Sequence, residues 1–199
     1  ANEMTALYVT PPTQMQFTDE AVPSGLGPAT RLVLTFGVLF LDADLDGRLD
    51  LFTANGHLEN EINKVQTSQH YEQPPQLFWN CGSNAQTEFV LMSEQQVGAD
   101  LRRPLVGRGA AAADIDGDGD FDVFGGTYDG NILFLQNNGI ASNPIFSAAS
   151  TNPFSLSNIG SYAHPVFADI DGDHDFDVFV NNAATSDTFY FQNIGTPDN

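Results

Sequence analysis

The sequence predicts an all-β fold made of repeated antiparallel sheets, and three observations support this prediction. Three aspartate-rich segments share one internal spacing, namely Asp42–Asp50, Asp114–Asp122 and Asp169–Asp177. Short runs of Val, Phe and Leu flank them, such as VLFL and LDLFT around the first, and such runs favour strands and are too short for helices. A further strand ending in asparagine follows each segment, at Asn80, Asn137 and Asn193. The predicted unit is therefore strand, aspartate loop, strand, strand.

The spacing of these landmarks sets the register of the repeats. The first loop aspartates lie 72 and then 55 residues apart, and the turn asparagine follows the last loop aspartate by 30, 15 and 16 residues. The first unit therefore carries an insertion of about 14 residues, which we place within residues 57–75. Phe89 and Phe146, on a fourth strand, precede the next loop by 25 and 23 residues. Phe17 precedes Asp42 by 25, so residues 5–19 should be the last two strands of a preceding unit.

Four-stranded antiparallel units with a turn at every joint are typical of β-propeller blades. We expect about three four-stranded blades and part of another, with strands grouped two, four, four and three. The expected boundaries are 5–19 for the end of a preceding blade, 20–93 for a blade with the insertion, 94–149 for the next blade, and 150–195 for an incomplete blade. A β-solenoid of calcium-binding nonapeptides is the competing architecture, but its sites recur every nine residues.

A propeller closes with about 4–8 blades, which is more than these repeats supply. We therefore expect the remaining blades to come from a longer chain or from a partner in a larger assembly. Exposed apolar end faces would make the isolated segment something other than a monomer.

Each aspartate segment has the pattern D-x-D-x-D-G-x-x-D, with His174 in place of the glycine in the third. Side chains at positions 1, 3, 5 and 9 of a tight loop can converge on one point, and the carbonyl of position 7 adds an oxygen. This hard, all-oxygen shell suits Ca²⁺ better than the strict octahedron of Mg²⁺, so we expect three Ca²⁺ sites. The expected ligands are Asp42, Asp44, Asp46, Arg48 (by its carbonyl) and Asp50; Asp114, Asp116, Asp118, Asp120 and Asp122; and Asp169, Asp171, Asp173, Asp175 and Asp177.

Two alternatives compete with this interpretation. An EF-hand needs a bidentate Glu at position 12, where this chain has Thr53, Gly125 and Val180. Simple Asp-rich turns would use their carboxylates only to bind local backbone, although so many close carboxylates repel one another without a cation. Position 6 requires a positive φ, which glycine adopts without strain. His174 should therefore make the third loop the weakest or least regular.

Composition restricts the classes of binding partner and the cellular compartment that we expect for this protein. With 26 acidic and 6 basic residues the formal charge is −20, and no basic stripe is present that could bind nucleic acid or an anionic membrane. No apolar stretch approaches the ~20 residues of a membrane span, so direct membrane insertion is not expected. Cys81 is the single cysteine, which excludes an internal disulfide framework. Filled calcium loops and the lack of an N-x-S/T sequon favour an extracellular or periplasmic bacterial setting.

No catalytic constellation is visible, so we expect no enzyme. The four histidines lack metal-site spacing, and neither a nucleophile elbow nor a P-loop occurs. Glu59 and Glu61 fit a solvated loop better than an acid/base pair. We expect the recurring strand aromatics to form core between blades and not a sugar-stacking platform; they are Phe78, Trp79, Phe134, Tyr190 and Phe191.

The segments GVLFLDADLDGRLDLFTANGH, QLFWNCG and GRGAAAADIDGDGDFDVF together resemble the FG-GAP/VCBS repeats. They are most similar to the calcium-binding propellers of the cartilage acidic protein (ASPIC/UnbV-associated) family and, more distantly, to the integrin α-chain propeller. The resemblance covers nearly the whole chain and implies a calcium-rigidified propeller with an ion between the first and second strands of each blade. His174 departs from the pattern. No cysteine-rich or EGF-like segment occurs, so an animal extracellular-matrix role is not expected.

Two function hypotheses follow. The first is a non-enzymatic calcium-binding propeller for adhesion, binding or assembly with a protein or a glycan, on an extracytoplasmic surface. The alternative is a carbohydrate-binding lectin or a polysaccharide-lyase-type propeller, which the fold alone does not exclude. The insertion at 57–75 could contact a partner through one short helix carrying Leu58, Ile62 and Val65, or it could be a tolerated surface loop.

Overall fold

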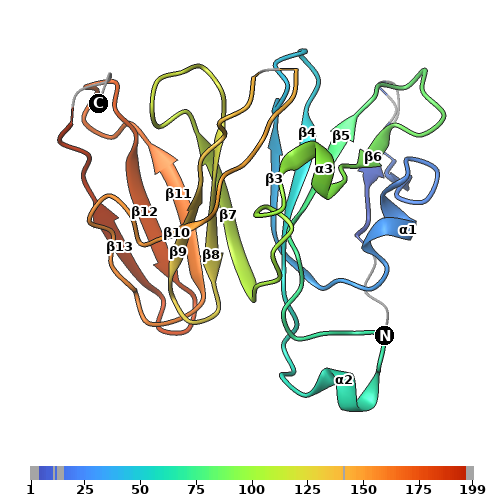
Figure 1. Cartoon of the computed structure of the whole chain (residues 1–199), viewed down its shortest axis with the longest axis horizontal. Coiled ribbons are helices and arrows are strands. Elements are labelled where there is room, and N and C mark those ends of the chain that lie inside the picture. The colour runs from blue at the N-terminus through green and yellow to red at the C-terminus, as the bar shows by residue number, and fades with distance from the viewer. Residues whose placement is uncertain (1–4, 11, 13–15, 141, 196–199) are drawn as a thin grey trace.

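The computed structural model describes residues 5–10, 12, 16–140 and 142–195. These residues form thirteen strands in four antiparallel sheets and three short helices (Figure 1). The first two sheets contain β1 (Tyr8–Val9) and β2 (Thr18–Asp19), then β3 (Thr35–Leu41), β4 (Asp50–Asn55), β5 (Gln76–Asn80) and β6 (Phe89–Leu91). The other two contain β7 (Gly107–Ala113), β8 (Asp122–Thr127), β9 (Ile132–Leu135) and β10 (Ser150–Thr151), then β11 (Ala163–Ala168), β12 (Asp177–Asn182) and β13 (Asp187–Phe191).

The all-β prediction is confirmed, and the strands group as two, four, four and three. In every sheet each strand pairs antiparallel with the next strand in sequence, as in a meander. The sheets stand side by side in Figure 1 and, over the described residues, form an open array and not a closed ring. Two sheets, β3–β6 and β7–β10, have four strands each. In the described part of the chain the β11–β13 sheet has three strands and no fourth.

Hydrophobic side chains fill the spaces between neighbouring sheets. One cluster, around Phe52, Leu77 and Val123, joins the β3–β6 sheet to the β7–β10 sheet. A second, around Phe124 and Ile132, joins the latter to the β11–β13 sheet. The inner sheets therefore bury both faces, and every residue of β4 and β8 is buried. Each fully buried large side chain contributes roughly 1.5–3 kcal/mol.

Close contacts between the first strands bring the three aspartate loops to one side of the molecule. A Cβ on Gly37 would lie 2.8 Å from the carbonyl carbon of Gly109, and a Cβ on Gly109 would lie 2.5 Å from the Cα of His164. Only glycine therefore fits at these crossings of β3, β7 and β11. Gly37, Gly109 and His164 each precede the first aspartate of their loop by five positions. The three loops therefore lie at corresponding strand ends.

The insertion forms a long connection between β4 and β5 and contains the predicted short helix, α2 (Ile62–Val65). This helix projects at the edge opposite the β3–β4 loop (Figure 1). The base of the insertion is tied down, because Gly56 bridges to Glu72 and Gln73 bridges to Leu105. The two ends of the insertion are thus held by backbone bridges, whereas its middle, around α2, is exposed.

Two helices were not expected from the sequence. They are α1 (Leu26–Thr30) and α3 (Glu94–Val97), and α3 begins with a capping box between Ser93 and Gln96. One aromatic prediction is wrong, because Tyr190 is not core but 45% exposed and stacks on Phe179. In the described part of the chain, no helix is long and apolar enough to cross a membrane.

Candidate metal centre

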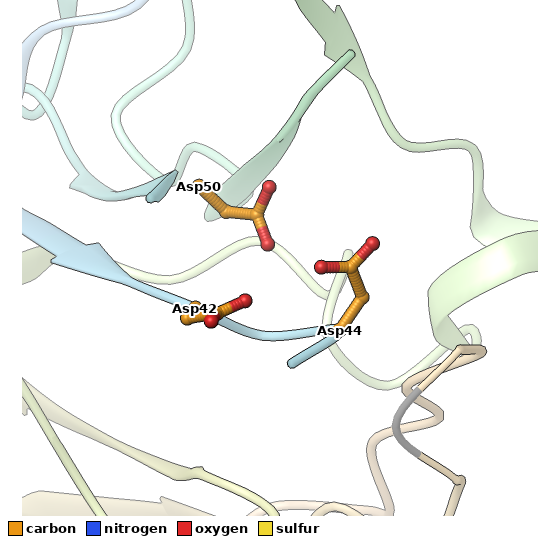
Figure 2. A group of neighbouring side chains, drawn as sticks. All are labelled: Asp42, Asp44 and Asp50. Carbon is orange, nitrogen blue, oxygen red and sulfur yellow. The ribbon is translucent and has the colours of Figure 1, made fainter. Parts of the chain in front are cut away.

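The three aspartate loops connect the first and second strands of their sheets, and each brings carboxylates together. In every loop three carboxylates offer oxygens within 4.8 Å of one another. In the first loop the three carboxylates face a common point (Figure 2). The groups are Asp42, Asp44 and Asp50; Asp114, Asp116 and Asp118; and Asp169, Asp171 and Asp173. An all-oxygen, anionic donor set of this kind suits a hard cation such as Ca²⁺.

The three converging aspartates do not occupy the same positions in every loop. They come from positions 1, 3 and 9 in the first loop and from positions 1, 3 and 5 in the other two. In the first loop the position 5 residue, Asp46, is paired with Arg48 instead: the Arg48 guanidinium forms an ion pair with Asp46, and its Nε donates to the Asn80 carbonyl at 2.8 Å. Arg48 was predicted only as a carbonyl ligand, and no pattern in the sequence pointed to this side-chain contact.

Backbone N–H groups fix the carboxylates at positions 1 and 5. In the second loop Asp114 accepts from Gly117 at 2.9 Å and from Gly119 at 3.0 Å. Asp118 accepts from Asp120 at 2.9 Å. These are the local bonds that a plain Asp-rich turn would also make. The convergence of three carboxylates is the feature that goes beyond such a turn, because like charges this close oppose the fold unless a cation lies between them.

The aspartate at position 9 is buried in all three loops and fastens the loop to the third strand. The Oδ1 of Asp122 accepts from the N–H of Asn137 at 2.8 Å, and its Oδ2 accepts from the N–H of Ile115 at 3.3 Å. Asp50 and Asp177 repeat the arrangement, accepting from Asn80 and Ala43, and from Asn193 and Ile170. Position 9 is therefore a structural clasp as well as a candidate ligand. The side chain of the turn asparagine serves the turn itself, because its Oδ1 accepts from the N–H of the glycine two residues on in all three repeats.

The backbone at positions 4 and 6 has positive φ. At position 6, φ is 86° for Gly47, 92° for Gly119 and 76° for His174, as predicted for the left-handed region. Position 4 was not predicted to need this conformation, yet the first loop places Leu45 there at φ 54° where the others have glycine. The first and third loops thus each hold one strained residue, and only the second loop has glycine at both positions.

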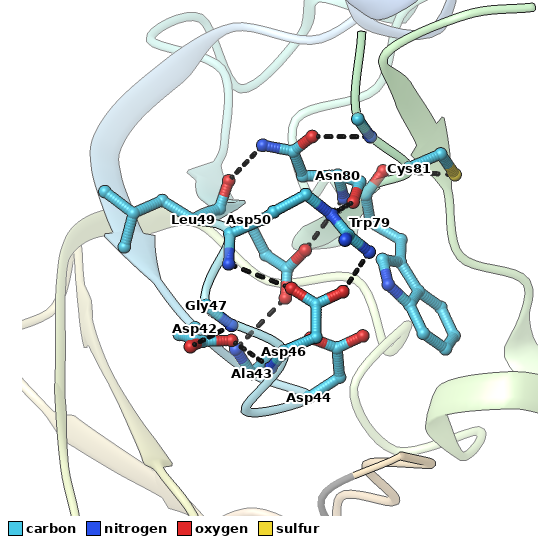
Figure 3. A network of polar contacts seen from close by, with 12 residues as sticks. Asp42, Ala43, Asp44, Asp46, Gly47, Leu49, Asp50, Trp79, Asn80 and Cys81 are labelled. Atoms are coloured by element: carbon cyan, nitrogen blue, oxygen red, sulfur yellow. Dashed lines mark hydrogen bonds and ion pairs between the residues drawn. The ribbon is translucent and has the colours of Figure 1, made fainter. Parts of the chain in front are cut away.

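In the second and third loops a glutamine directly after the third strand donates to the position 3 aspartate. Gln136 Nε2 donates to Asp116 at 2.6 Å, and Gln192 Nε2 donates to Asp171 at 2.8 Å. In the first loop the corresponding residue is Trp79, whose indole lies beside the carboxylate of Asp44 (Figure 3). None of these three residues was predicted as a site residue, although the repeat alignment places all three directly before the turn asparagine.

The model of the FG-GAP-like repeat family matches residues 114–180. This match supports an FG-GAP repeat family. The matched region begins at the first aspartate of the second loop and extends into β12, so it contains the second and third loops and strands β8 to β11. No curated protein matches the sequence.

In all three loops, burial acts against the charged form of particular carboxylates. It raises the pKa of Asp50 and Asp122 to about 6, although two backbone N–H groups on each carboxylate oppose the shift. Burial and then neighbouring aspartates also raise the pKa of Asp120 and Asp175. The Oδ2 of Asp175 is buried without a hydrogen-bond partner in the described part of the chain. A cation would stabilise these charges and satisfy such an oxygen.

Proposed function

We propose that this chain is a calcium-binding FG-GAP-type β-propeller segment that acts as a non-catalytic module for binding or assembly outside the cytoplasm. The observation that carries the proposal is the convergence of three carboxylates, repeated at the same strand junction in three consecutive sheets. Three separate clusters of like charges would each destabilise the folded state unless a bound cation offset their repulsion.

Calcium fits the donor set better than other ions. The candidate ligands are carboxylates, with a carbonyl available at position 7, and no histidine or cysteine belongs to the groups of described residues. Carboxylate and carbonyl oxygens suit Mg²⁺, Ca²⁺ and Mn²⁺, and Ca²⁺ accepts the irregular shell that a flexible nine-residue loop supplies. Bound Ca²⁺ would supply charge neutralisation and hold the first two strands of each sheet together.

The outer surfaces of the array support a role in assembly. Strand β12 is only partly buried and four of the five residues of β13 are exposed, whereas the matching β8 is buried throughout. Val166 and Phe189 are exposed on this last sheet, and Tyr8 and Phe17 are exposed at the other end. Apolar surface at both ends of a stack of sheets is what further blades or a partner would cover.

An extracytoplasmic setting follows from the calcium proposal. Extracellular modules bind Ca²⁺ with Kd values of about 10⁻⁴–10⁻³ M, which only an external calcium concentration would fill. The net charge of −20 also agrees with a module that gains counter-charge from bound ions.

Calorimetric titration with Ca²⁺, and with Mg²⁺ for comparison, tests the proposal. We expect binding of Ca²⁺ that Mg²⁺ at the same concentration does not reproduce, and loss of one site in the Asp116→Asn variant. Absence of Ca²⁺ binding would overturn the proposal. Light scattering on the calcium-loaded segment tests the assembly part, which a stable monomer of 21.5 kDa would contradict.

A further inference from the structure

In the second and third loops the position 3 aspartate is held on both carboxylate oxygens. In the second loop Oδ1 of Asp116 accepts from the backbone N–H of Asp118 at 3.3 Å, while Oδ2 accepts from the Gln136 side chain at 2.6 Å. In the third loop Oδ1 of Asp171 accepts from the N–H of Asp173 at 3.4 Å, and Oδ2 accepts from Gln192 at 2.8 Å. The shorter bond comes from the side-chain donor in both loops. The donor directly follows the third strand of the sheet, 20 or 21 residues along the chain.

The first loop places a different chemical group at the corresponding position. Its position 3 residue, Asp44, accepts from the backbone N–H of Asp46 at 3.3 Å. The indole of Trp79 lies beside the Asp44 carboxylate, where the other loops have a glutamine amide (Figure 3). The ring also packs against the core cluster between the first two inner sheets. An indole has a single N–H and a rigid ring, so it fixes one orientation where a glutamine amide can rotate.

We infer that Trp79, Gln136 and Gln192 are positioning residues for the proposed cation sites: each orients the position 3 carboxylate and thereby sets the affinity of its loop. The inference rests on the proposed calcium function. Carboxylate ligands of metals are commonly fixed by such outer partners, whose removal weakens metal binding about 10–100-fold. The aspartate side chain has two rotatable bonds, and without its donor it must be ordered by the ion itself.

The inference separates the first loop from the other two. Trp79 is the only tryptophan in the chain, and its ring lies beside Asp44, a candidate ligand of the first loop. Occupancy of that one site should therefore change the intrinsic fluorescence, and the indole should sensitise a luminescent lanthanide bound there. Tb³⁺ is a suitable probe because it takes hard oxygen ligands as Ca²⁺ does.

The first experiment uses donor exchange on the full chain. Gln136→Leu removes the donor at a partly exposed position, and Gln136→Trp supplies the donor that the first loop uses. Trp79→Phe removes the indole N–H but keeps an aromatic ring, and Trp79→Gln supplies the donor of the other loops. Calorimetric Ca²⁺ titration should show one site weakened about 10–100-fold in Gln136→Leu and in Trp79→Phe. The two donor-exchange variants should recover most of the affinity.

The second experiment follows Tb³⁺ luminescence excited through tryptophan. We expect sensitised emission in the wild type, its loss in Asp44→Asn, and its retention in the matched variant of the second loop, Asp116→Asn. A role in folding alone would change the melting temperature in EDTA and leave the calcium affinities equal. If the wild type binds Ca²⁺ but Gln136→Leu and Trp79→Phe bind it equally well, the positioning role is wrong and the calcium function stands. If the wild type binds no Ca²⁺, both fail.

Discussion

Replacing the position 9 aspartate of the second loop should destabilise the protein even without calcium. Asp122 is 1% exposed and satisfies two backbone N–H groups, those of Asn137 and Ile115. In Asp122→Ala both donors lose their acceptor, and each unsatisfied buried group costs about 1–3 kcal/mol. The expected loss is therefore about 2–6 kcal/mol, of the ~5–15 kcal/mol that stabilises a typical domain.

Urea unfolding in EDTA measures this loss directly. Asp118→Ala is the matched control, because Asp118 is exposed and its loss removes a candidate ligand without breaking the clasp. We expect Asp122→Ala to lower the free energy of unfolding both in EDTA and in Ca²⁺, whereas Asp118→Ala lowers it mainly in Ca²⁺. Equal unfolding of Asp122→Ala and wild type in EDTA would refute the clasp.

Three further predictions follow from the loops and the insertion. Melting curves in Ca²⁺ should show a larger loss of melting temperature for Asp118→Ala than for Asp173→Ala, and the reverse order would contradict this ranking of the loops. His174→Gly should raise the melting temperature, because a non-glycine residue at positive φ costs roughly 1–2 kcal/mol. In EDTA, unfolding free energy should fall as pH rises from about 4 to about 6, because the two buried position 9 carboxyls with pKa about 6 favour the protonated folded state; a rise over that range would contradict it. Deleting residues 58–68 should leave the calcium-dependent melt intact and weaken self-association in light scattering, and unchanged association would place the partner surface elsewhere.

Much of the fold could be predicted because each repeat contains the same short sequence patterns. The aspartate loops, the turn asparagines and the strand aromatics recur at fixed offsets, so the sheets and their strand order follow from the sequence. The α1 and α3 helices were missed because each spans about one turn, which is too short for a periodic signal. Tyr190 was misplaced because its strand lacks the covering neighbour that the earlier sheets have, and alternation alone does not reveal which sheet lies at an end.

The convergence of carboxylates could be predicted from the sequence, and the residues that support them could not. The aspartate spacing located the three converging groups because each lies within nine residues, but it did not show which three of the predicted positions lie closest in each loop. Trp79, Gln136 and Gln192 lie 20 or more residues along the chain from their loops, and a tryptophan aligned with two glutamines shows no shared residue type in the sequence. The strain at Leu45 was likewise hidden, because leucine in the first loop gives no sign that position 4 needs a positive φ.

The central claim is that calcium holds these sheets together, and thermal unfolding in Ca²⁺ and in EDTA tests it most directly. A ligand that binds only the folded state stabilises it by about 2.7 kcal/mol per site at 100-fold saturation, and each kcal/mol shifts the melting temperature of a chain of this size by about 2–4 °C. With three sites filled, the midpoint in Ca²⁺ should exceed that in EDTA by more than 10 °C or so, and Mg²⁺ should not substitute. An identical midpoint in Ca²⁺ and EDTA would contradict the account.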